Sequence, residues 1–357
     1  MVLSFIITYS AYSISQLIGL FRAKKKDYRE TNSFTKKINL NSTSLIIPFR
    51  NESKRITELL NSIKRSPELP LEVLFINDHS NDDSVNKIES NLKDYDINYK
   101  VIHLTEDKIG KKEAIRFGIK NTSTKTKYIL TFDADISFNE KYFTNLKNLP
   151  LKDLYILPVI MKGKGLLESF FSLDYNLLNT INRITFGFKR PILASGANLL
   201  FCKEVFTKLD SIHSHKHIAS GDDMFLLRDF VQNKASIHLY NHKNNIVKTS
   251  SPSSIYSFYQ QRVRWISKNK TLNDKLNNKI IFFNSVILFF FYLTIIKYIS
   301  KNELLISLFI LIFKNFLDLL IISVSEIKLS KTEKIILPFY TVIQPFYYLS
   351  LWIIPLF

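Results

Sequence analysis

The chain has 357 residues, a formal net charge of +18 and a hydrophobic content of 46%, including 29 phenylalanines. This length suits one large domain or two smaller ones, and the single cysteine, Cys202, excludes an internal disulfide framework and suits a reducing compartment. The surplus of positive charge is compatible with nucleic acid, anionic lipid or a phosphorylated substrate as partner.

The first 21 residues contain no charged side chain, and a basic stretch from Arg22 to Lys26 follows at once. In a secretory signal peptide the positive charges precede the apolar stretch and a small-residue cleavage site follows it. The reverse order here favours an uncleaved membrane anchor over residues 1–21. An interfacial or partly buried helix is the alternative, because Ser, Thr and Tyr make the segment only modestly apolar.

The next part of the chain alternates strand and helix patterns. Short apolar runs predict strands at residues 44–48, 71–76, 101–104 and 128–132, and helical patterns lie between them at 58–64, 82–92 and 111–119. Strands that alternate with helices predict an α/β fold with a mostly parallel sheet and right-handed crossovers. No G-x-G-x-x-G pattern or P-loop opens the first helix, which argues against a dinucleotide fold.

Two carboxylates follow the last of these strands, in the sequence Tyr128-Ile-Leu-Thr-Phe-Asp133-Ala-Asp135. If the extended conformation continues through them, both side chains point to the same side. Their mutual repulsion is relieved by a divalent cation or by a shared proton. Ligands of parallel α/β sheets bind beyond the carboxyl ends of strands, so this pair is a candidate Mg²⁺ or Mn²⁺ site completed by substrate phosphates.

Two segments of the following region allow alternative interpretations. His213, His215 and His217 alternate as metal ligands would on one face of a strand, but no Cys or carboxylate joins them at ligand spacing, so a polar loop is the favoured interpretation. Residues 254–267 show an apolar stripe at helical spacing, which predicts an amphipathic helix at a bilayer surface.

Three apolar blocks follow at residues 280–299, 304–324 and 335–357, each about as long as the ~20 residues that cross a bilayer. Lys314 and Asp318 interrupt the middle block four residues apart, so they are expected to pair on one helix face. Basic residues follow the first apolar segment and flank the later ones so that all three basic stretches fall on one side of the membrane. By the positive-inside rule that side is the cytoplasm.

Seven short motifs stand in order along the chain, and together they resemble glycosyltransferase family 2. The similarity covers about residues 45–268, and the C-terminal helices resemble the membrane-integrated branch that includes cellulose, chitin and hyaluronan synthases and ceramide glucosyltransferase. The most discriminating motif is Q-x-x-R-W. The series is Pro48-Phe-Arg-Asn-Glu52, Asn77-Asp78-His-Ser-Asn-Asp82-Asp83-Ser84, Gly110-Lys111, Asp133-Ala-Asp135, Gly196-Ala-Asn198, Gly221-Asp222-Asp223 and Gln261-Arg-Val-Arg264-Trp265.

The resemblance implies a GT-A fold, a nucleotide-sugar donor, a Mg²⁺ or Mn²⁺ ion and inversion at the anomeric carbon. It departs from the family pattern at Arg116, where Asn is frequent, at Gly221-Asp222, where Thr-Glu or Glu is frequent, and in a short segment before the base motif, which weighs against a processive enzyme. The implied site residues are Glu52, Asp78, Lys111, Asp133 and Gln261 for the nucleotide, Asp135 with Asp133 for the metal, and Asp223 as general base with Arg264 and Trp265 at the reaction centre.

Elementary chemistry supports several of these roles independently. A carboxylate such as Asp223 can accept the proton of an attacking hydroxyl group, although a helix N-cap is its alternative role. A metal on Asp135 and the guanidinium of Arg264 can stabilise a departing diphosphate. Trp265 suits either the face of a sugar ring or an aromatic anchor at the membrane interface.

These observations predict a membrane-bound, metal-dependent inverting hexosyltransferase of the cell envelope. It has an N-terminal anchor (1–21), a cytoplasmic GT-A domain ending in an interfacial helix (22–279) and three transmembrane helices (280–357). The expected donor is a UDP-sugar, and the expected acceptor is a lipid or a membrane-associated glycan. The alternatives are a processive polysaccharide synthase and a catalytically inactive membrane scaffold. A nucleic-acid partner is not expected, because the basic residues are dispersed and do not form one face with stacking aromatics.

Overall fold

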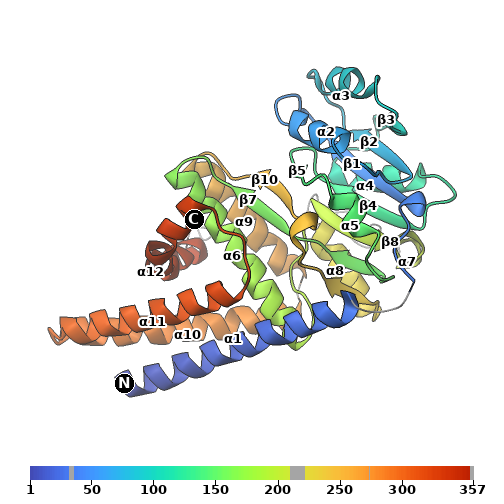
Figure 1. Ribbon diagram of the computed structural model, residues 1–357. Coiled ribbons are helices and arrows are strands. Elements are labelled where there is room, and N and C mark those ends of the chain that lie inside the picture. The colour runs from blue at the N-terminus through green and yellow to red at the C-terminus, as the bar shows by residue number, and fades with distance from the viewer. Residues whose placement is uncertain (32–35, 210–221, 273, 354–357) are drawn as a thin grey trace. The chain divides into compact units, whose positions relative to one another are not determined.

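The computed structural model describes residues 1–31, 36–209, 222–272 and 274–353, and the chain forms two compact units (Figure 1). The unit called here the sheet unit comprises residues 26–160 and 193–250. The helical unit comprises residues 1–25, 161–192 and 251–357. This division by contacts differs from the expected boundaries after residues 21 and 279, because two helices from the middle of the chain associate with the apolar helices.

The sheet unit is built on a seven-stranded sheet with the order β3-β2-β1-β4-β8-β6-β9. All neighbours pair in parallel except β8, which is antiparallel to β4 and to β6. The mostly parallel α/β sheet is therefore confirmed, and the four predicted strands match β1 to β4 to within two residues. The strands are β1 (Thr43–Phe49), β2 (Glu72–Asn77), β3 (Tyr99–His103), β4 (Tyr128–Phe132), β6 (Leu154–Ile156), β8 (Asn198–Cys202) and β9 (Ile237–Leu239).

The central strands are buried along their whole length, as strands covered on both faces are. Pro48 stands inside β1 although proline cannot donate a ladder hydrogen bond. The pairing of β1 with β4 ends at Ile46 and Thr131, so Pro48 lies beyond that ladder and is opposed only by Ile76 of β2. The strand thus keeps its central place without losing a hydrogen bond to β4.

Helices alternate with the first four strands, as expected. The predicted helices correspond to α2 (Thr57–Lys64), α3 (Ser84–Leu92) and α4 (Lys111–Lys120). The unit also contains α5 (Tyr142–Leu146), α7 (Lys203–Leu209), α8 (Asp222–Gln232) and the short helices η1 (Leu40–Ser42) and η3 (Lys243–Asn245). A smaller sheet has the order β5-β10-β7 and is formed by β5 (Ser137–Phe138), β10 (Val247–Ser250) and β7 (Val159–Lys162).

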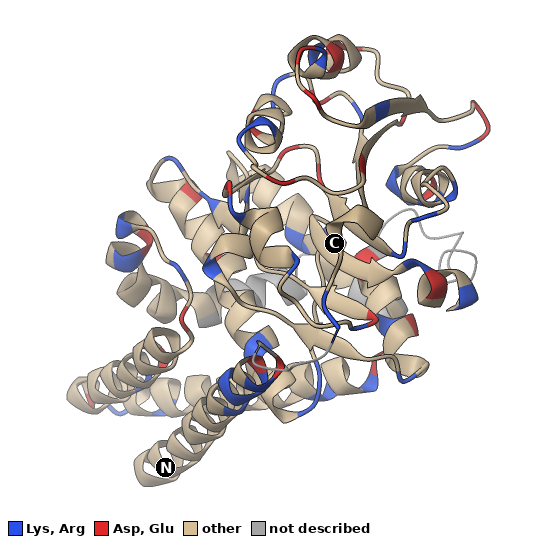
Figure 2. Ribbon diagram, turned by 45° about the vertical axis from the view of Figure 1, so that its right-hand side comes forward, with Lys and Arg blue, Asp and Glu red and all other residues tan. Residues whose placement is uncertain are grey.

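Among the residues that the structure describes, the helical unit contains three helices that are long and apolar enough to cross a membrane, namely Val2–Glu30 of α1 (Val2–Thr31), α10 (Lys275–Ser300) and α11 (Leu304–Val324). They run side by side in Figure 1 and share a core of Phe5, Tyr9, Ile287, Phe291 and Ile310. In Figure 2 the helix at the N label is tan over most of its length and blue at its far end, as the order of apolar and basic residues predicts. The fourth expected span falls on α12 (Lys331–Ile353), and its residues 354–357 lie outside the described part of the chain.

The expected pairing of Lys314 with Asp318 is confirmed, with 2.6 Å between Nζ and Oδ2. Tyr9 of α1 donates a hydrogen bond of 2.6 Å to the other carboxylate oxygen, and Lys314 also donates to the main-chain oxygen of Thr341 on α12 at 3.1 Å. In an α-helix that oxygen accepts from the N–H four residues on, which is absent because residue 345 is proline. Lys314 thus supplies the donor that proline lacks and ties α11 to α12.

A second buried ion pair joins α6 (Leu166–Phe188), α9 (Ile255–Leu272) and α12. Asp174 of α6 contacts the Arg262 guanidinium at 2.5 Å and accepts a hydrogen bond of 2.6 Å from the Tyr340 hydroxyl, and the exposed fractions of Asp174, Arg262 and Tyr340 are 1%, 4% and 0%. The Phe171 and Phe258 rings stack beside this pair with centroids 4.2 Å apart. The association of α9 with α6 therefore rests on both charge and aromatic packing.

Helices α1 and α6 approach each other through two glycines. A Cβ atom on Gly187 would lie 1.8 Å from the main-chain oxygen of Gly19, and one on Gly19 would lie 2.9 Å from Ile184 and from Phe188. Any side chain at these positions would force the helices apart, so the sequence needs glycine at both.

Candidate active site

The polar residues that follow β1, β2 and β4 lie at one edge of the sheet, beyond the carboxyl ends of these parallel strands. Glu52, Asp78 and Asp133 each follow the end of a strand by one to three residues, as expected for ligand-binding residues of an open α/β sheet. Strand β4 ends at Phe132, and Ala134 and Asp135 form a turn. The assumption of continued extended backbone was therefore wrong, yet the turn still brings both aspartates into one group.

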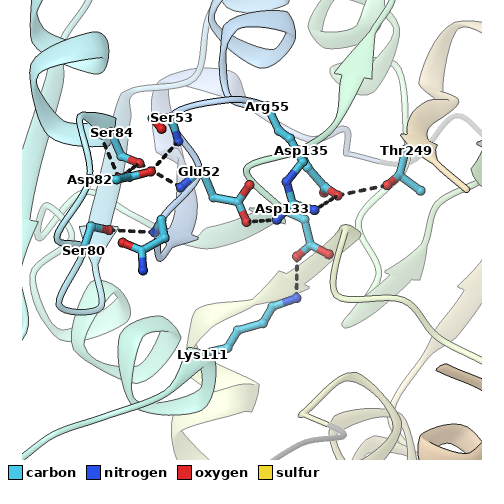
Figure 3. Close-up of polar contacts among 11 residues, drawn as sticks. Glu52, Ser53, Arg55, Ser80, Asp82, Ser84, Lys111, Asp133, Asp135 and Thr249 are labelled. Atoms are coloured by element: carbon cyan, nitrogen blue, oxygen red, sulfur yellow. Dashed lines mark hydrogen bonds and ion pairs between the residues drawn. The ribbon is translucent and has the colours of Figure 1, made fainter. Parts of the chain in front are cut away.

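Glu52, Asp133 and Asp135 form an acidic cluster held by two cationic side chains (Figure 3). The Arg55 guanidinium lies 2.6 Å from Glu52 Oε1 through Nη2 and 3.4 Å from Asp135 Oδ2 through Nη1. The ammonium group of Lys111 contacts Asp133 Oδ1. Thr249 of β10 donates a hydrogen bond of 3.3 Å to Asp135 Oδ2.

The cluster carries more negative than positive charge, and two of its acids have raised pKa values. Burial raises the pKa of Asp135, and the neighbouring charge of Asp133 raises it further. Burial also raises the pKa of Glu52, against the opposing effect of Arg55, with added repulsion from Asp135 and Asp133. The buried Oε2 of Glu52 accepts no hydrogen bond from the described residues. Both facts indicate a site that favours an additional cation or hydrogen-bond donor.

The loops after β1 and β2 are fixed to each other by side-chain hydrogen bonds (Figure 3). The carboxylate of Asp82 accepts from the main-chain N–H of Ser53 and of Ser84, both at 3.0 Å, and the Ser84 hydroxyl accepts from the Glu52 N–H at 2.8 Å. Burial opposes ionisation of Asp82, but these hydrogen bonds outweigh it and hold the pKa of its carboxyl well below the usual range. Asn51 and His79 adopt positive φ angles of 56° and 58°, a conformation that is uncommon for non-glycine residues and clusters at functional sites.

Asp78 and Lys111 are linked through the start of α4. Oδ1 of Asp78 accepts a hydrogen bond of 3.0 Å from the N–H of Gly110, whose φ of 101° suits glycine. Lys111 is the first residue of the helix, so this contact directs its side chain toward Asp133. The structure thus brings Glu52, Asp78, Lys111, Asp133 and Asp135 together at one edge, while their roles stay predictions.

Asp223 lies inside the first turn of α8 and not before it, so it is not placed as an N-cap. Its Oδ2 accepts from the Gly196 N–H at 3.1 Å, and its Oδ1 accepts from the Met224 N–H at 2.8 Å. A Cβ atom at Gly196 would lie 3.3 Å from Lys111 Nζ and 3.9 Å from Asp223 Cβ. Glycine therefore allows Lys111 and Asp223 to approach the same point of the main chain.

Gln261, Arg264 and Trp265 lie on α9 in the helical unit. Gln261 Oε1 accepts a hydrogen bond of 2.7 Å from Arg262, whose guanidinium also lies 4.3 Å from the centre of the Trp265 ring. The Arg264 side chain is exposed. The apolar stripe expected to contact a bilayer surface instead packs on α6, where Phe258, Tyr259 and Ile266 join Phe170 and Phe171.

In the described part of the chain, no three His, Cys, Asp or Glu side chains converge as a complete metal site. Mg²⁺ and Mn²⁺ are nevertheless held by one or two carboxylates together with substrate phosphates, and Asp133 and Asp135 fit that requirement in a cluster with surplus negative charge. His213, His215, His217 and Gly221 lie outside the described residues, as does the side chain of Asp222.

Two residues that contact the acidic cluster, Arg55 and Thr249, were not predicted from the sequence. Arg55 stands three residues after Glu52 near the start of a helix, a spacing at which opposite charges meet, so that signal was present. Thr249 is 114 residues from its partner Asp135. It reaches the site only because β10 pairs with β5, immediately after the aspartate turn.

The mostly parallel sheet, with acidic and basic side chains grouped beyond its carboxyl edge, has the fold of a GT-A-type domain. The family model of glycosyl transferase family 2 matches residues 44–209, and that of glycosyl transferase family group 2 matches residues 128–355, more than half of the chain. The chain belongs to this family of glycosyltransferases. None of the curated proteins compared with the chain matches it.

The chain is similar to several solved structures at low sequence identity. The mannosyltransferase PcManGT from Pyrobaculum calidifontis, in complex with GDP-Man and Mn²⁺, is 13% identical and has a TM-score of 0.53, over 97% of this chain and 99% of that one. TarS 1–349 from S. aureus, in complex with UDP-GlcNAc, is 18% identical with a TM-score of 0.42, over 62% of this chain and 64% of that one. Glucosyl-3-phosphoglycerate synthase from Mycobacterium tuberculosis, with Mn²⁺, UDP and phosphoglyceric acid, is 15% identical with a TM-score of 0.44, over 66% and 80%. This chain thus matches less than two thirds of TarS 1–349.

Proposed function

We propose that this glycosyltransferase is an integral membrane enzyme that moves a hexose from a nucleotide-sugar, a UDP-sugar, to a lipid or a membrane-associated glycan with inversion. The observation that carries the proposal is the acidic cluster with surplus negative charge at the carboxyl edge of the sheet, where Lys111 is held against it. The three helices able to cross a membrane support a substrate at the membrane. The sheet unit is proposed to lie in the cytoplasm because of the basic residues that flank the apolar segments.

The acidic cluster would hold the metal and part of the donor. Asp135 and Asp133 are the proposed ligands of a Mg²⁺ or Mn²⁺ ion, which when bound neutralises charge on the departing nucleoside diphosphate. Glu52 and Asp78 are proposed to contact the nucleoside. Lys111 and the Gln261 side chain are proposed to contact the diphosphate and adjoining groups of the nucleotide, because an ammonium group and an amide donate hydrogen bonds to phosphate oxygens.

Asp223 is the proposed general base. Main-chain N–H groups occupy one acceptor position on each of its carboxylate oxygens, and each oxygen retains a further lone pair for an acceptor hydroxyl. In an inverting transfer the hydroxyl oxygen forms a bond to the anomeric carbon as the bond from that carbon to the diphosphate breaks. The hydroxyl proton passes to Asp223.

Arg264 and Trp265 are proposed to act at the reaction centre from α9. The exposed Arg264 guanidinium suits the diphosphate of the leaving group. Trp265 already packs one face near the Arg262 guanidinium and lies 5.7 Å from the Tyr175 ring. Its position is therefore fixed by aromatic and cationic neighbours, which suits a ring that orients a sugar.

The test is release of nucleoside diphosphate by the detergent-purified chain with Mn²⁺, membrane lipid extract and a panel of UDP- and GDP-sugars. We expect release that is selective for one donor, requires the metal, and falls at least about a hundredfold in Asp223→Asn. Asp94→Asn, which changes an exposed acid after α3 that lies outside the motifs, is the matched control and should keep full activity.

If no nucleoside diphosphate is released and calorimetry detects no donor binding, the proposal of an active enzyme is overturned in favour of an inactive scaffold. Donor binding without release would show that the supplied lipids lack the acceptor. The product mass distinguishes single transfer from the processive alternative, which predicts a ladder of masses one sugar apart.

A further inference from the structure

Arg55 connects two members of the acidic cluster that the family resemblance left without a cationic partner. Its guanidinium contacts Glu52 Oε1 at 2.6 Å and Asp135 Oδ2 at 3.4 Å, and both contacts are drawn in Figure 3. Glu52 and Asp135 retain only 15% and 22% of their side-chain exposure, whereas Arg55 retains 56%. The arginine therefore reaches from solvent onto two shielded carboxylates.

These contacts are not needed to hold the loop that carries Glu52. The main-chain N–H groups of Glu52 and Ser53 are fixed by the hydroxyl of Ser84 and the carboxylate of Asp82. The half-exposed Arg55 side chain also buries little area of its own. Replacement of Arg55 should therefore leave the loop and the fold intact, so a change in binding can be assigned to the loss of its guanidinium group.

A divalent cation at Asp135 must share this carboxylate with the guanidinium. Two like charges within a few ångströms repel each other, although solvent weakens the effect at an exposed site. A nucleoside diphosphate weakens this competition. Its negatively charged oxygens can accept two parallel hydrogen bonds from the planar guanidinium group. The arginine then has a second anionic partner within the same cluster.

We propose that Arg55 couples metal binding to donor binding: its guanidinium competes with a divalent cation for Asp135 and takes the donor diphosphate as its partner when donor and metal bind together. The inference rests on the proposed function for the identity of the donor. It assigns to Arg55 a role in the order of binding, since metal alone is disfavoured and metal with diphosphate is favoured.

The test measures two affinities in the full-length, detergent-purified chain with Arg55→Met. Free Mn²⁺, followed by electron paramagnetic resonance, gives the affinity for metal alone. Calorimetry with UDP and with GDP at saturating Mn²⁺ gives the affinity for the diphosphate. We expect Mn²⁺ alone to bind about two- to fivefold more tightly, as for removal of an exposed charge, and the preferred nucleotide to bind about tenfold more weakly, as for loss of a hydrogen bond to a charged group.

Two variants control for charge and for surface position. Arg55→Lys keeps the charge but not the planar fork, so metal affinity should stay within twofold of the wild-type value while nucleotide affinity falls part of the way. Lys54→Met removes the adjacent exposed cation and should change neither affinity.

A rise in Mn²⁺ affinity together with a fall in nucleotide affinity indicates coupling, because general damage to the site would lower both affinities. Mn²⁺ affinity that is unchanged or reduced in Arg55→Met, or nucleotide affinity that is unchanged, would overturn the inference. Failure of the wild-type chain to bind either nucleotide would instead overturn the proposed function. The metal-only measurement keeps the two failures distinguishable.

Discussion

The two units use ionisable side chains in opposite ways. In the sheet unit, three acids share two cations at a partly exposed edge, and two of the acids have raised pKa values. In the helical unit, the Asp174–Arg262 and Lys314–Asp318 pairs are matched one to one, and both arginine and lysine are at most 4% exposed. Unbalanced charge at an edge favours a ligand, whereas balanced and buried charge makes each helix depend on its neighbours.

The strongest test of this contrast is Asp174→Leu, which leaves the buried Arg262 without its carboxylate. Removing one partner of a buried ion pair costs about 3–5 kcal/mol of stability, so we expect a large fall in the apparent melting temperature in detergent. The double variant Asp174→Leu with Arg262→Met should recover most of the loss, since no buried charge is then left unpaired. A single variant as stable as the wild type would contradict the balanced-pair interpretation.

A purely steric change in the helical unit should have the next largest effect. Gly187→Val places a side chain where its Cβ would lie 1.8 Å from the Gly19 oxygen, and overpacking of this kind costs about 1–3 kcal/mol. The measurement is again the apparent melting temperature, with Gly165→Ala as control because a Cβ there meets nothing within 4 Å. Equal melting temperatures for the two variants would show that α1 and α6 are not held in close contact.

A smaller loss is expected at the start of α10. Asp274 caps the helix through the N–H groups of Leu276 and Asn277 and contacts Arg190 through both oxygens at 2.7 Å. Asp274→Ala should lower the free energy of unfolding by about 0.5–2 kcal/mol, the usual loss for a cap. Asp274→Asn should retain part of this stabilisation.

The same aspartate gives a pH dependence. Although burial opposes ionisation, Arg190 and the helix N–H groups lower the pKa of Asp274 below 3.8. A lowered pKa in the folded state stabilises the protein above the unfolded value and loses that effect as the pH falls through the folded value. The melting temperatures of the wild type and Asp274→Asn should therefore converge below about pH 4, and a difference that persists at lower pH would contradict the assignment.

Replacement of Asp135 is expected to have the smallest effect on stability of these variants and the largest effect on Mn²⁺ binding. Burial and Asp133 raise the pKa of Asp135, so its ionised form opposes folding, and the stability present below pH 3.8 is lost as the pH rises through the folded pKa. Asp135→Asn should leave the melting temperature at pH 7 unchanged or slightly higher, while Mn²⁺ binding and activity fall at least about a hundredfold. A strongly destabilised variant would show that the sheet-unit cluster is structural after all.

Much of the sheet unit was predictable from the sequence, because its signals are local. Tyr128–Phe132 is a buried strand with the predicted ends, and Asp133 and Asp135 follow it in sequence. Arg55 was within reach of the same reasoning. Thr249, in contrast, joins Asp135 through strand pairing that no local pattern encodes.

The helical unit was less predictable, because its polar contacts join segments far apart in the chain. The Lys314–Asp318 pair follows from a spacing of four residues, but the partners of that pair, Tyr9 and Thr341, come from two other helices. The apolar stripe of α9 was assigned to a membrane surface, and it packs on α6 instead. Hydrophobic periodicity shows that a helix face is covered without showing by what.

The contacts of α12 have a consequence for how the chain is assembled during synthesis. Asp174 receives its hydrogen bond from Tyr340, 166 residues later, and Asn176 donates to Glu333, 157 residues later. Domains generally fold as units while the chain emerges from the ribosome. Here α6 is made long before the residues that satisfy its buried polar groups, so a chain that ends before α12 leaves Asp174 and Asn176 without these partners.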